Sequence, residues 1–372
     1  MKSILTNLGL LLASVLFGLV ALEALCWLVA PPPKPDLPVG LMVRGPAMEW
    51  RLSPNFHGIM DNRVDFQDAE IHADGDGRRI VPAAPATAPH RLWVLGDSQT
   101  FGHGVSDEQA WPNRLQERLN QRGVAIKVLN LGVPGINIDQ YLARIQAIAS
   151  GIAPGDTVLI GVSWNDIITP PPTEPVQQAV VAGHLVSAQA AAPENRDSTE
   201  ARIKFYEWSG IVVPPLQDLK SVLDALSQTS ALVGVTYPRL KAIYYRLRRH
   251  TPIATMVAQK VPEANFALLS AIRSIVEGRG ARLVVALLAE RMFFEDDAYR
   301  VFSVDGRDYP TQDYMASLAE PLCRDAGIDC LNVFPLLHHH QAEAIVFRID
   351  GHFNAKGTAL LGPWLADRIY PP

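Results

Sequence analysis

The stretch RLWVLGDSQTFG, residues 91–102, determines how the rest of the chain is interpreted. Its first half, Arg91 to Leu95, is apolar and β-prone, which is typical of a buried strand. Gly96 follows directly, and small residues at this point permit a tight turn after the strand. The sequence therefore predicts that Ser98 lies at the carboxyl end of a strand with its hydroxyl exposed.

Strands and helices alternate on both sides of this stretch. The predicted helices cover 107–123, a segment starting at Asn137, 262–278, 312–325 and a segment after Asn354, and the other strands cover 126–131, 156–162, 282–288 and 329–333. This alternation predicts a parallel sheet covered by helices on both faces, with a site at the carboxyl ends of its strands. We expect Pro363 to kink or shorten the final helix.

Three further segments stand outside this alternation. Residues 1–30 form an apolar N-terminal segment, and residues 31–90, rich in proline, glycine and aspartate, are interpreted as an extended segment that wraps the domain. Residues 91–372 then form the α/β domain. An insertion of about residues 170–261 interrupts it, with a hairpin at 180–186 and one or two helices between 216 and 249.

The N-terminal segment predicts a membrane helix. Leu8 to Val29 is apolar except for Ser14 and Glu23, and 22 residues at a helical rise of about 1.5 Å reach roughly 33 Å, close to the hydrocarbon thickness of a bilayer. A carboxylate such as Glu23 costs on the order of 2 to 3 kcal/mol at mid-bilayer and less near the edge. The alternative is a cleaved signal peptide, for which Ala24-Leu25-Cys26 is a poor cleavage site.

Composition and charge restrict the remaining possibilities. The chain has 372 residues, 48% of them hydrophobic, and a net charge of -5, so it can bury a sizeable core but makes an unlikely partner for nucleic acid. Lys2 before the apolar segment favours a cytoplasmic N-terminus and an exported domain. In an oxidising compartment Cys323 and Cys330 can pair, while two buried free thiols are the equally open alternative.

Ser98 needs a base, and that base needs a group that orients it. Asp350 and His352 supply both, and residues two apart in an extended segment project on one side. His352 is expected to remove the Ser98 proton, while Asp350 orients the imidazole and stabilises its cation. The oxyanion would be bound by the Ser98 backbone N–H, by the loop containing Gly135 and by the Asn165 amide.

In these four separated blocks, over about residues 91–370, the sequence resembles the SGNH, or GDSL-like, hydrolase superfamily. The resemblance implies a flavodoxin-like three-layer domain without metal or organic cofactor. It matches Ser98 to the family's nucleophile, Gly135 and Asn165 to its oxyanion residues, and Asp350 with His352 to its final block. The Gly-Asp-Ser-Gln-Thr block and the two-residue spacing of the final block look like a membrane-anchored branch that adds or removes acetyl groups on bacterial polysaccharides.

Other candidate residues receive structural interpretations. Asp97 is expected to hydrogen-bond the turn, His103 to contact the rim of the site instead of acting as base, and His338-His339-His340 to form a solvated loop instead of a metal site. Residues 237–249 mix aromatic and basic side chains, which favours an amphipathic packing helix over a lipid-contacting helix or a lid.

Three hypotheses about function follow. The first is a serine-dependent esterase or O-acyltransferase on acyl, most simply acetyl, esters of extracytoplasmic carbohydrate, anchored in the bacterial inner membrane by one span with its domain in the periplasm or exterior. The second is a non-catalytic carbohydrate-binding or assembly protein on the same fold. The third is a lipid esterase or thioesterase.

Overall fold

The computed structural model describes residues 2–32, 36–45, 49–169, 229–247, 261–295 and 323–372, with short pieces between residues 171 and 227. Within these ranges the largest sheet has the strand order β11-β10-β7-β5-β6, and every neighbouring pair is parallel. Its strands are β5 (His90–Gly96), β6 (Ile126–Asn130), β7 (Thr157–Ser163), β10 (Arg282–Leu288) and β11 (Asp329–Asn332). This is the flavodoxin-like order, so the predicted fold class is confirmed.

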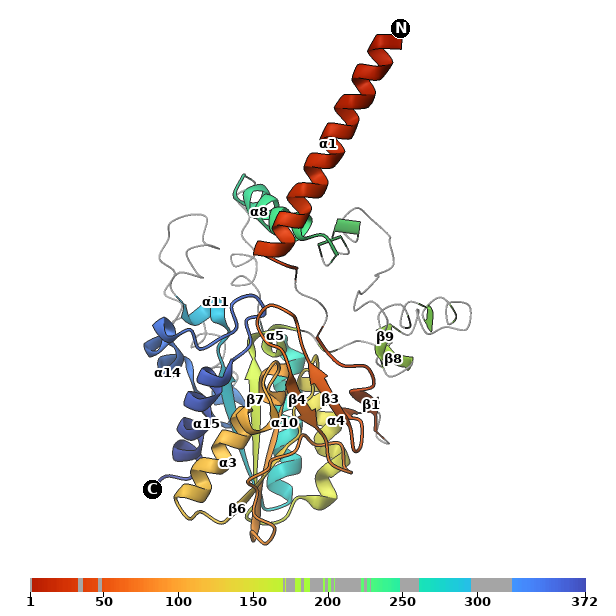
Figure 1. Cartoon of the computed structure of the whole chain (residues 1–372). Helices are drawn as coiled ribbons and strands as arrows, with labels where there is room; N and C mark the ends of the chain where they lie inside the picture. The colour runs from red at the N-terminus through yellow and green to blue at the C-terminus, as the bar shows by residue number, and fades with distance from the viewer. Residues whose placement is uncertain are drawn as a thin grey trace.

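Helices cover both faces of the sheet (Figure 1). On one face α3 (Trp111–Gln121) packs against α15 (Ala355–Ile369), and on the other α4 (Ile138–Ile148) packs against α10 (Glu263–Gly278). Successive residues of β5 point to opposite faces. Leu92 and Val94 therefore join the core beneath α3 and α15, while Trp93 and Leu95 join the core beneath α4 and α10. Burial on both faces explains why this strand is almost continuously apolar.

Short helices follow the carboxyl ends of three strands. They are α2 (Ser98–Phe101) after β5, α5 (Trp164–Ile168) after β7 and α11 (Arg291–Phe294) after β10. The remaining short elements are η1 (Asp107–Gln109), η2 (Ala149–Gly151), α14 (Phe334–His339) and η3 (Gln341–Glu343). Because parallel strands end at one edge of the sheet, the residues that begin these helices gather there.

Residues 36–81 pack against the α/β domain through two small antiparallel hairpins. The first pairs β1 (Met42–Arg44) with β2 (Trp50–Leu52), and the second pairs β3 (His57–Met60) with β4 (Ala69–His72). Trp50, Leu52, Met60 and Ile71 are at most 2% exposed and belong to the same core as α4 and α10. Apolar burial at about 25 cal/mol per Å² therefore holds this segment on the domain.

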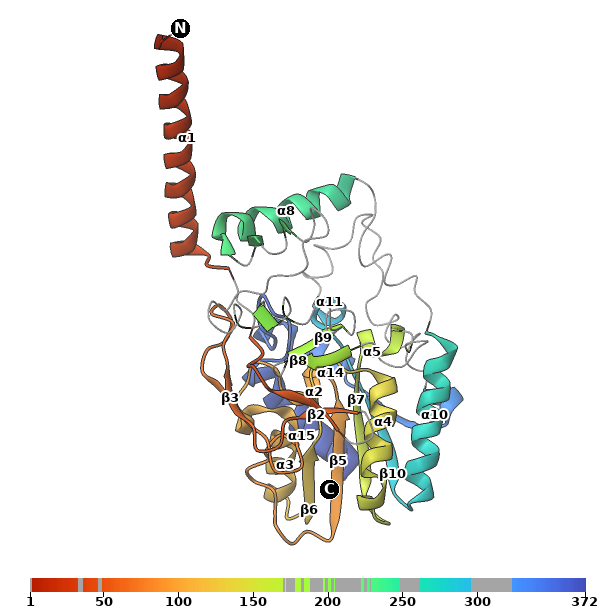
Figure 2. The ribbon, with the colours of Figure 1, turned by 90° about the vertical axis from the view of Figure 1, so that its right-hand side faces the viewer.

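The N-terminal helix α1 (Lys2–Val29) projects from the molecule, and α8 (Ala231–Leu247) lies across its base (Figure 2). Within α1, Thr6–Val29 has a mean hydropathy of 2.3 and none of it is buried, so its length and composition suit a membrane span. A further antiparallel hairpin pairs β8 (Gln178–Val181) with β9 (His184–Ser187).

One expectation from the sequence is wrong, and one part of another does not hold. His338 and His339 belong to α14, and His340 caps it, where a solvated loop was expected. The final helix α15 is not shortened at Pro363. A Cβ on Gly362 would lie 2.6 Å from the Trp111 carbonyl oxygen, so α15 packs closely on α3. This packing outweighs the roughly 3 kcal/mol cost of a proline inside a helix.

The predicted helix 312–325 lies mostly outside the described residues, which resume with a helical turn at Cys323. Cys323 is joined to Cys330 by a disulfide, with a Cα–Cα distance of 5.9 Å. This bond ties the helical turn to β11, the edge strand of the sheet. Closing so short a loop is worth about 2 kcal/mol in the chain-entropy account.

Candidate active site

Ser98 begins α2 at the carboxyl end of β5. Asp97 is the N-cap, and its carboxylate accepts a hydrogen bond from the Gln99 N–H at 2.9 Å, so the expected structural role of Asp97 agrees with the geometry. Gly102 ends the helix with a φ of 89°, a left-handed conformation that favours glycine. The sequence thus makes a four-residue helix that presents Ser98 in its first turn.

A buried arginine from the wrapping segment fixes this short helix. The Arg79 side chain is fully buried and donates hydrogen bonds to the carbonyl oxygens of Phe101 at 2.7 Å and Gly102 at 2.6 Å. It also pairs with Asp107 at 2.8 Å. Orphan carbonyls at a helix end need donors, and a charged donor supplies a strong one. The role of Arg79 was not predicted, because it depends on a contact between segments more than 20 residues apart.

The structure brings Ser98, His352 and Asp350 together. His352 Nε2 lies 2.7 Å from Ser98 Oγ across 254 positions of sequence, and His352 Nδ1 lies 2.6 Å from Asp350 Oδ1. With the Nδ1–H donating to the carboxylate, Nε2 is free to accept the proton of the Ser98 hydroxyl. This is the hydrogen-bond chain of a nucleophile, its base and the group that orients the base.

Charges around the imidazole favour its protonation once Ser98 has been deprotonated. Burial opposes ionisation of Asp350, but the hydrogen bond and charge of His352, with the charge of His103, hold the Asp350 pKa below its ordinary value. Burial opposes the imidazolium of His352, yet Asp350 and then the charges of Asp97 and Glu290 raise its pKa. The site therefore stabilises the cation that forms during attack.

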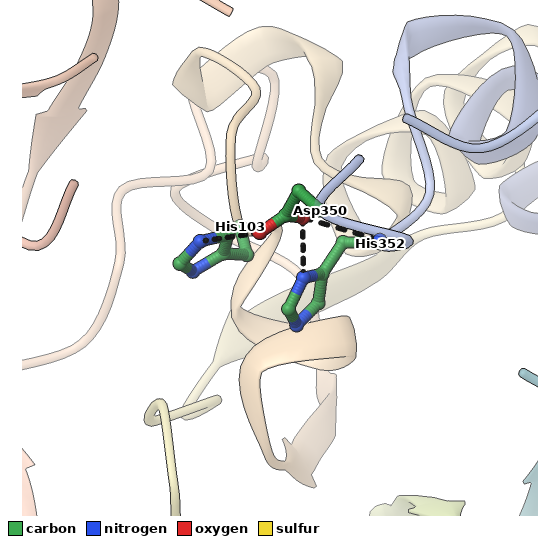
Figure 3. A group of neighbouring side chains, drawn as sticks. All are labelled: His103, Asp350 and His352. Carbon is green, nitrogen blue, oxygen red and sulfur yellow. Dashed lines mark hydrogen bonds and ion pairs between the residues drawn. The ribbon is translucent and has the colours of Figure 1, made fainter. Parts of the chain in front are cut away.

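A second histidine is stacked on this group. The His103 ring lies with its centroid 4.3 Å from that of His352, and His103 Nε2 lies 3.5 Å from Asp350 Oδ2 (Figure 3). His103 Nε2 also donates to Asp36 Oδ2 at 2.7 Å. His103 is only 7% exposed, so it is not the rim contact that the sequence suggested. Reasoning from the sequence did not find Asp36, which comes from the wrapping segment.

The ligand atoms of His103, Asp350 and His352 lie within 4.8 Å of one another, close enough to hold a metal ion. Each of these side chains already has a hydrogen-bond partner within the network, and Asp350 and His352 are partners of each other. A metal on these atoms would compete with the serine–histidine bond. The cluster is therefore interpreted as a proton-handling network.

The candidate oxyanion donors follow the carboxyl ends of β6 and β7, the two strands that flank β5. Gly135, with a φ of 75°, lies in the exposed loop after β6, and no atom within 4 Å would obstruct a side chain there. Asn165 is in the first turn of α5, after β7. Ser163 and Asp166 already form the capping box of α5, so the Asn165 amide is not needed as a cap. This leaves it available for a ligand at the sheet edge.

Glu290 was not predicted from the sequence to take part in catalysis. It follows β10 and precedes α11, at the same edge of the sheet as Ser98. Burial, together with the charge of Asp97, raises the pKa of Glu290 to about 7 in spite of the opposing charge of His352. A carboxyl group that titrates near neutrality beside the triad is a candidate for contact with the substrate.

Comparison with known proteins assigns the chain to a family. The sequence model of the GDSL-like Lipase/Acylhydrolase family matches residues 94–360, so the chain belongs to that family and to its class of ester-hydrolysing enzymes. It is 33% identical over 84 residues to an arylesterase of Vibrio mimicus, a match that covers 23% of this chain and 42% of the arylesterase. The match thus spans less than half the length of that relative.

Solved structures with the same fold include a lipolytic G-D-S-L family protein from Veillonella parvula, with a TM-score of 0.38 and 13% identity over 76% of this chain and 98% of that one. The psychrotrophic esterase of a Pseudoalteromonas species has a TM-score of 0.37 and 14% identity over 75% and 96% of the two chains. These overall similarities are low, and the fold assignment stands on the strand order and the family match.

Proposed function

We propose that this chain is a serine esterase or O-acyltransferase that acts on acyl esters, most simply acetyl esters of carbohydrate, outside the cytoplasm. The observation that carries the proposal is the continuous chain of hydrogen bonds from Ser98 through His352 to Asp350 at the carboxyl edge of the sheet. Membership of the acylhydrolase family supports the ester as the bond that is broken.

The reaction would have two halves. Ser98 Oγ attacks the ester carbonyl while His352 Nε2 takes the hydroxyl proton, and the resulting oxyanion is met by the Ser98 N–H, the Gly135 loop and the Asn165 amide. Collapse breaks the ester C–O bond, and His352 returns the proton to the departing alcohol. Water or a sugar hydroxyl then attacks acyl-Ser98 and loses its proton to His352. The bond between the acyl carbon and Ser98 Oγ breaks, and His352 gives the proton back to Oγ, which restores the serine.

The location follows from the N-terminal helix. We propose that α1 is a single span of the bacterial inner membrane, with its N-terminus in the cytoplasm and the catalytic domain outside. Its apolar stretch of 24 residues and the disulfide between Cys323 and Cys330 support this arrangement.

Turnover of an aryl acetate by the purified chain, compared with the Ser98→Ala variant, tests the mechanism. We expect the substitution to reduce kcat by about 10⁴-fold or more, because the nucleophile itself is lost. Ser150→Ala, which alters an exposed serine outside the site, is the matched control. Equal turnover by both variants would contradict the proposal.

A fluorophosphonate probe separates this function from a non-catalytic binding protein. Stoichiometric labelling of Ser98 is expected, and labelling is expected to disappear in Ser98→Ala and to persist in Ser150→Ala. A well-folded chain that takes up no label would favour the carbohydrate-binding alternative on the same fold.

A further inference from the structure

A very short segment separates the end of α1 from the catalytic network. Asp36 lies seven residues after Val29, the last residue of α1, and its carboxylate is hydrogen-bonded to His103 at 2.7 Å. His103 in turn stacks on His352. A chain extends at most about 3.6 Å per residue, so these seven residues reach about 25 Å at most. The catalytic network therefore begins within that distance of the end of α1.

One loop of the wrapping segment links the end of α1 to the catalytic loop independently. The Arg63 guanidinium lies 5.1 Å from the centroid of the Trp27 ring, and Arg63 donates to the Pro32 carbonyl oxygen at 2.9 Å. Two residues later, Asp65 accepts hydrogen bonds from the N–H groups of Ile349 at 2.9 Å and Asp350 at 2.7 Å. Arg63, which contacts the end of α1, and Asp65, which holds the catalytic loop, are therefore only two residues apart.

A third contact uses the charged residue inside the apolar segment. The Glu23 carboxylate accepts hydrogen bonds from the Ser230 hydroxyl at 2.9 Å and from the N–H groups of Ala231 at 2.8 Å and Leu232 at 3.0 Å. A negative charge at a helix N-terminus is stabilising, so Glu23 caps α8. Figure 2 shows α8 lying across the base of α1 as a result.

The position of this cap brings α8 close to the bilayer surface. Glu23 lies six residues before the end of α1, which is about 9 Å along a helix. On α8, Leu240 and Ile243 are 62% and 52% exposed. If α1 spans the membrane, the N-terminus of α8 lies about 9 Å inside the outer end of the span, near the boundary between acyl chains and headgroups, where exposed apolar side chains can enter lipid.

We infer that the substrate of Ser98 is an ester presented by the membrane surface, such as an acyl group on a lipid-linked sugar, and not an ester on a polymer far from the bilayer. This inference rests on the proposed function, because it places acyl transfer at Ser98. The contacts through Asp36 and through Arg63 and Asp65 hold the site near the end of α1, and the Glu23 contact places α8 beside α1. A short, fixed tether gives a high effective concentration of substrates on that surface and excludes those beyond its reach.

The test uses the full-length chain in vesicles of phosphatidylethanolamine and phosphatidylglycerol. One substrate is an aryl acetate attached to a phospholipid headgroup by a short spacer, and the other is a soluble aryl acetate. The variant combines a flexible Gly/Ser insertion after Ala30 with Glu23→Ala and Trp27→Ala, because these two side chains also hold α1 to the rest of the chain. Asp36 and the triad stay in place. The same insertion beside Gly123, in the turn between α3 and β6, is the matched control.

An insertion of about 20 residues adds roughly 25 Å of mean reach, and we expect it to reduce turnover of the lipid-attached ester about five- to tenfold. Turnover of the soluble ester should not change, and the control insertion should change neither. Unchanged turnover of the lipid-attached ester would overturn the inference. Loss of both activities in the Ala30 insertion alone would also overturn it, because the tether would then act on catalysis itself.

Energy transfer measures the same geometry without chemistry. A fluorophore is attached to Ser98→Cys in a Cys26→Ala background, and acceptor lipids are placed in the bilayer. The inference is supported when energy transfer is strong in the labelled chain without the insertion and weaker in the labelled chain with the insertion after Ala30. Weak transfer without the insertion overturns the inference, even if the soluble ester is hydrolysed. The outcome that would refute the proposed function, and the substrate inference with it, combines two results. The labelled Ser98→Cys chain shows strong transfer, and the unlabelled chain that keeps Ser98 cleaves neither ester.

Discussion

The two halves of the candidate site are held in place by different means. Ser98 is fixed by neighbours close in sequence, since β5 ends at Gly96 and the Asp97 cap begins α2 directly. Asp350 and His352 lie in a loop between α14 and α15 and are held by residues nearly 300 positions earlier, such as Asp65. The nucleophile half is therefore formed mainly by residues adjacent in sequence, with Arg79 holding the end of α2, while the base half depends on contacts across almost the whole chain.

The largest effect is expected from disabling the base half at Asp350. In Asp350→Asn the amide carries no charge, and its NH2 group can donate to Nδ1, which favours the unproductive tautomer of His352, so kcat should fall by about 10⁴-fold. Steady-state turnover of an aryl acetate measures it, with circular dichroism as the control for folding. A loss of less than tenfold would show that Asp350 does not orient the base.

The nucleophile half is tested next, at its oxyanion donor. Asn165→Ala removes an amide that the capping box of α5 does not use, and we expect kcat to fall about 10²- to 10³-fold with little change in KM. Asn120→Ala, on the partly exposed face of α3, serves as the comparison. An increase in KM at constant kcat would assign Asn165 to ground-state binding instead.

A smaller effect is expected from the residue that positions the base loop. Asp65→Asn weakens the acceptor for the N–H groups of Ile349 and Asp350. A hydrogen bond to a charged group contributes about 1.5 to 3 kcal/mol, so we expect roughly a tenfold loss of kcat. Asp65→Glu should restore part of the activity if the charge is what matters. Equal losses in both variants would show that geometry alone matters.

The smallest expected effect is a shift in pH dependence. His352 must be neutral to accept the Ser98 proton, and the charge of Glu290 helps to raise the His352 pKa. Glu290→Gln removes that charge, so the His352 pKa should fall and the acidic limb of the profile of kcat/KM against pH should move to lower pH. A shift to higher pH, or no shift, would remove Glu290 from the electrostatics of the site.

The prediction from sequence succeeded where periodicity and local motifs carry the information. The parallel sheet follows from alternating strands and helices, and the position of Ser98 follows from a strand that ends at Gly96 and from the N-capping Asp97 directly after it. His338–His340 show the limit of such reasoning. Their polarity suggested a loop, but Phe334 and Leu337 are buried and place the segment on a helix.

By itself, the sequence determined the α/β architecture, the apolar N-terminal segment and the identity of Ser98, Asp350 and His352 as partners by residue type. Only the tertiary structure decided that Asp36 bonds to His103, that Arg79 caps the nucleophile helix and that Glu23 caps α8. The physical reason is the separation in sequence over which each property is determined. Helical and strand periodicity is a property of neighbouring residues, whereas the burial and pairing of a charge depend on which distant segments the fold brings against it.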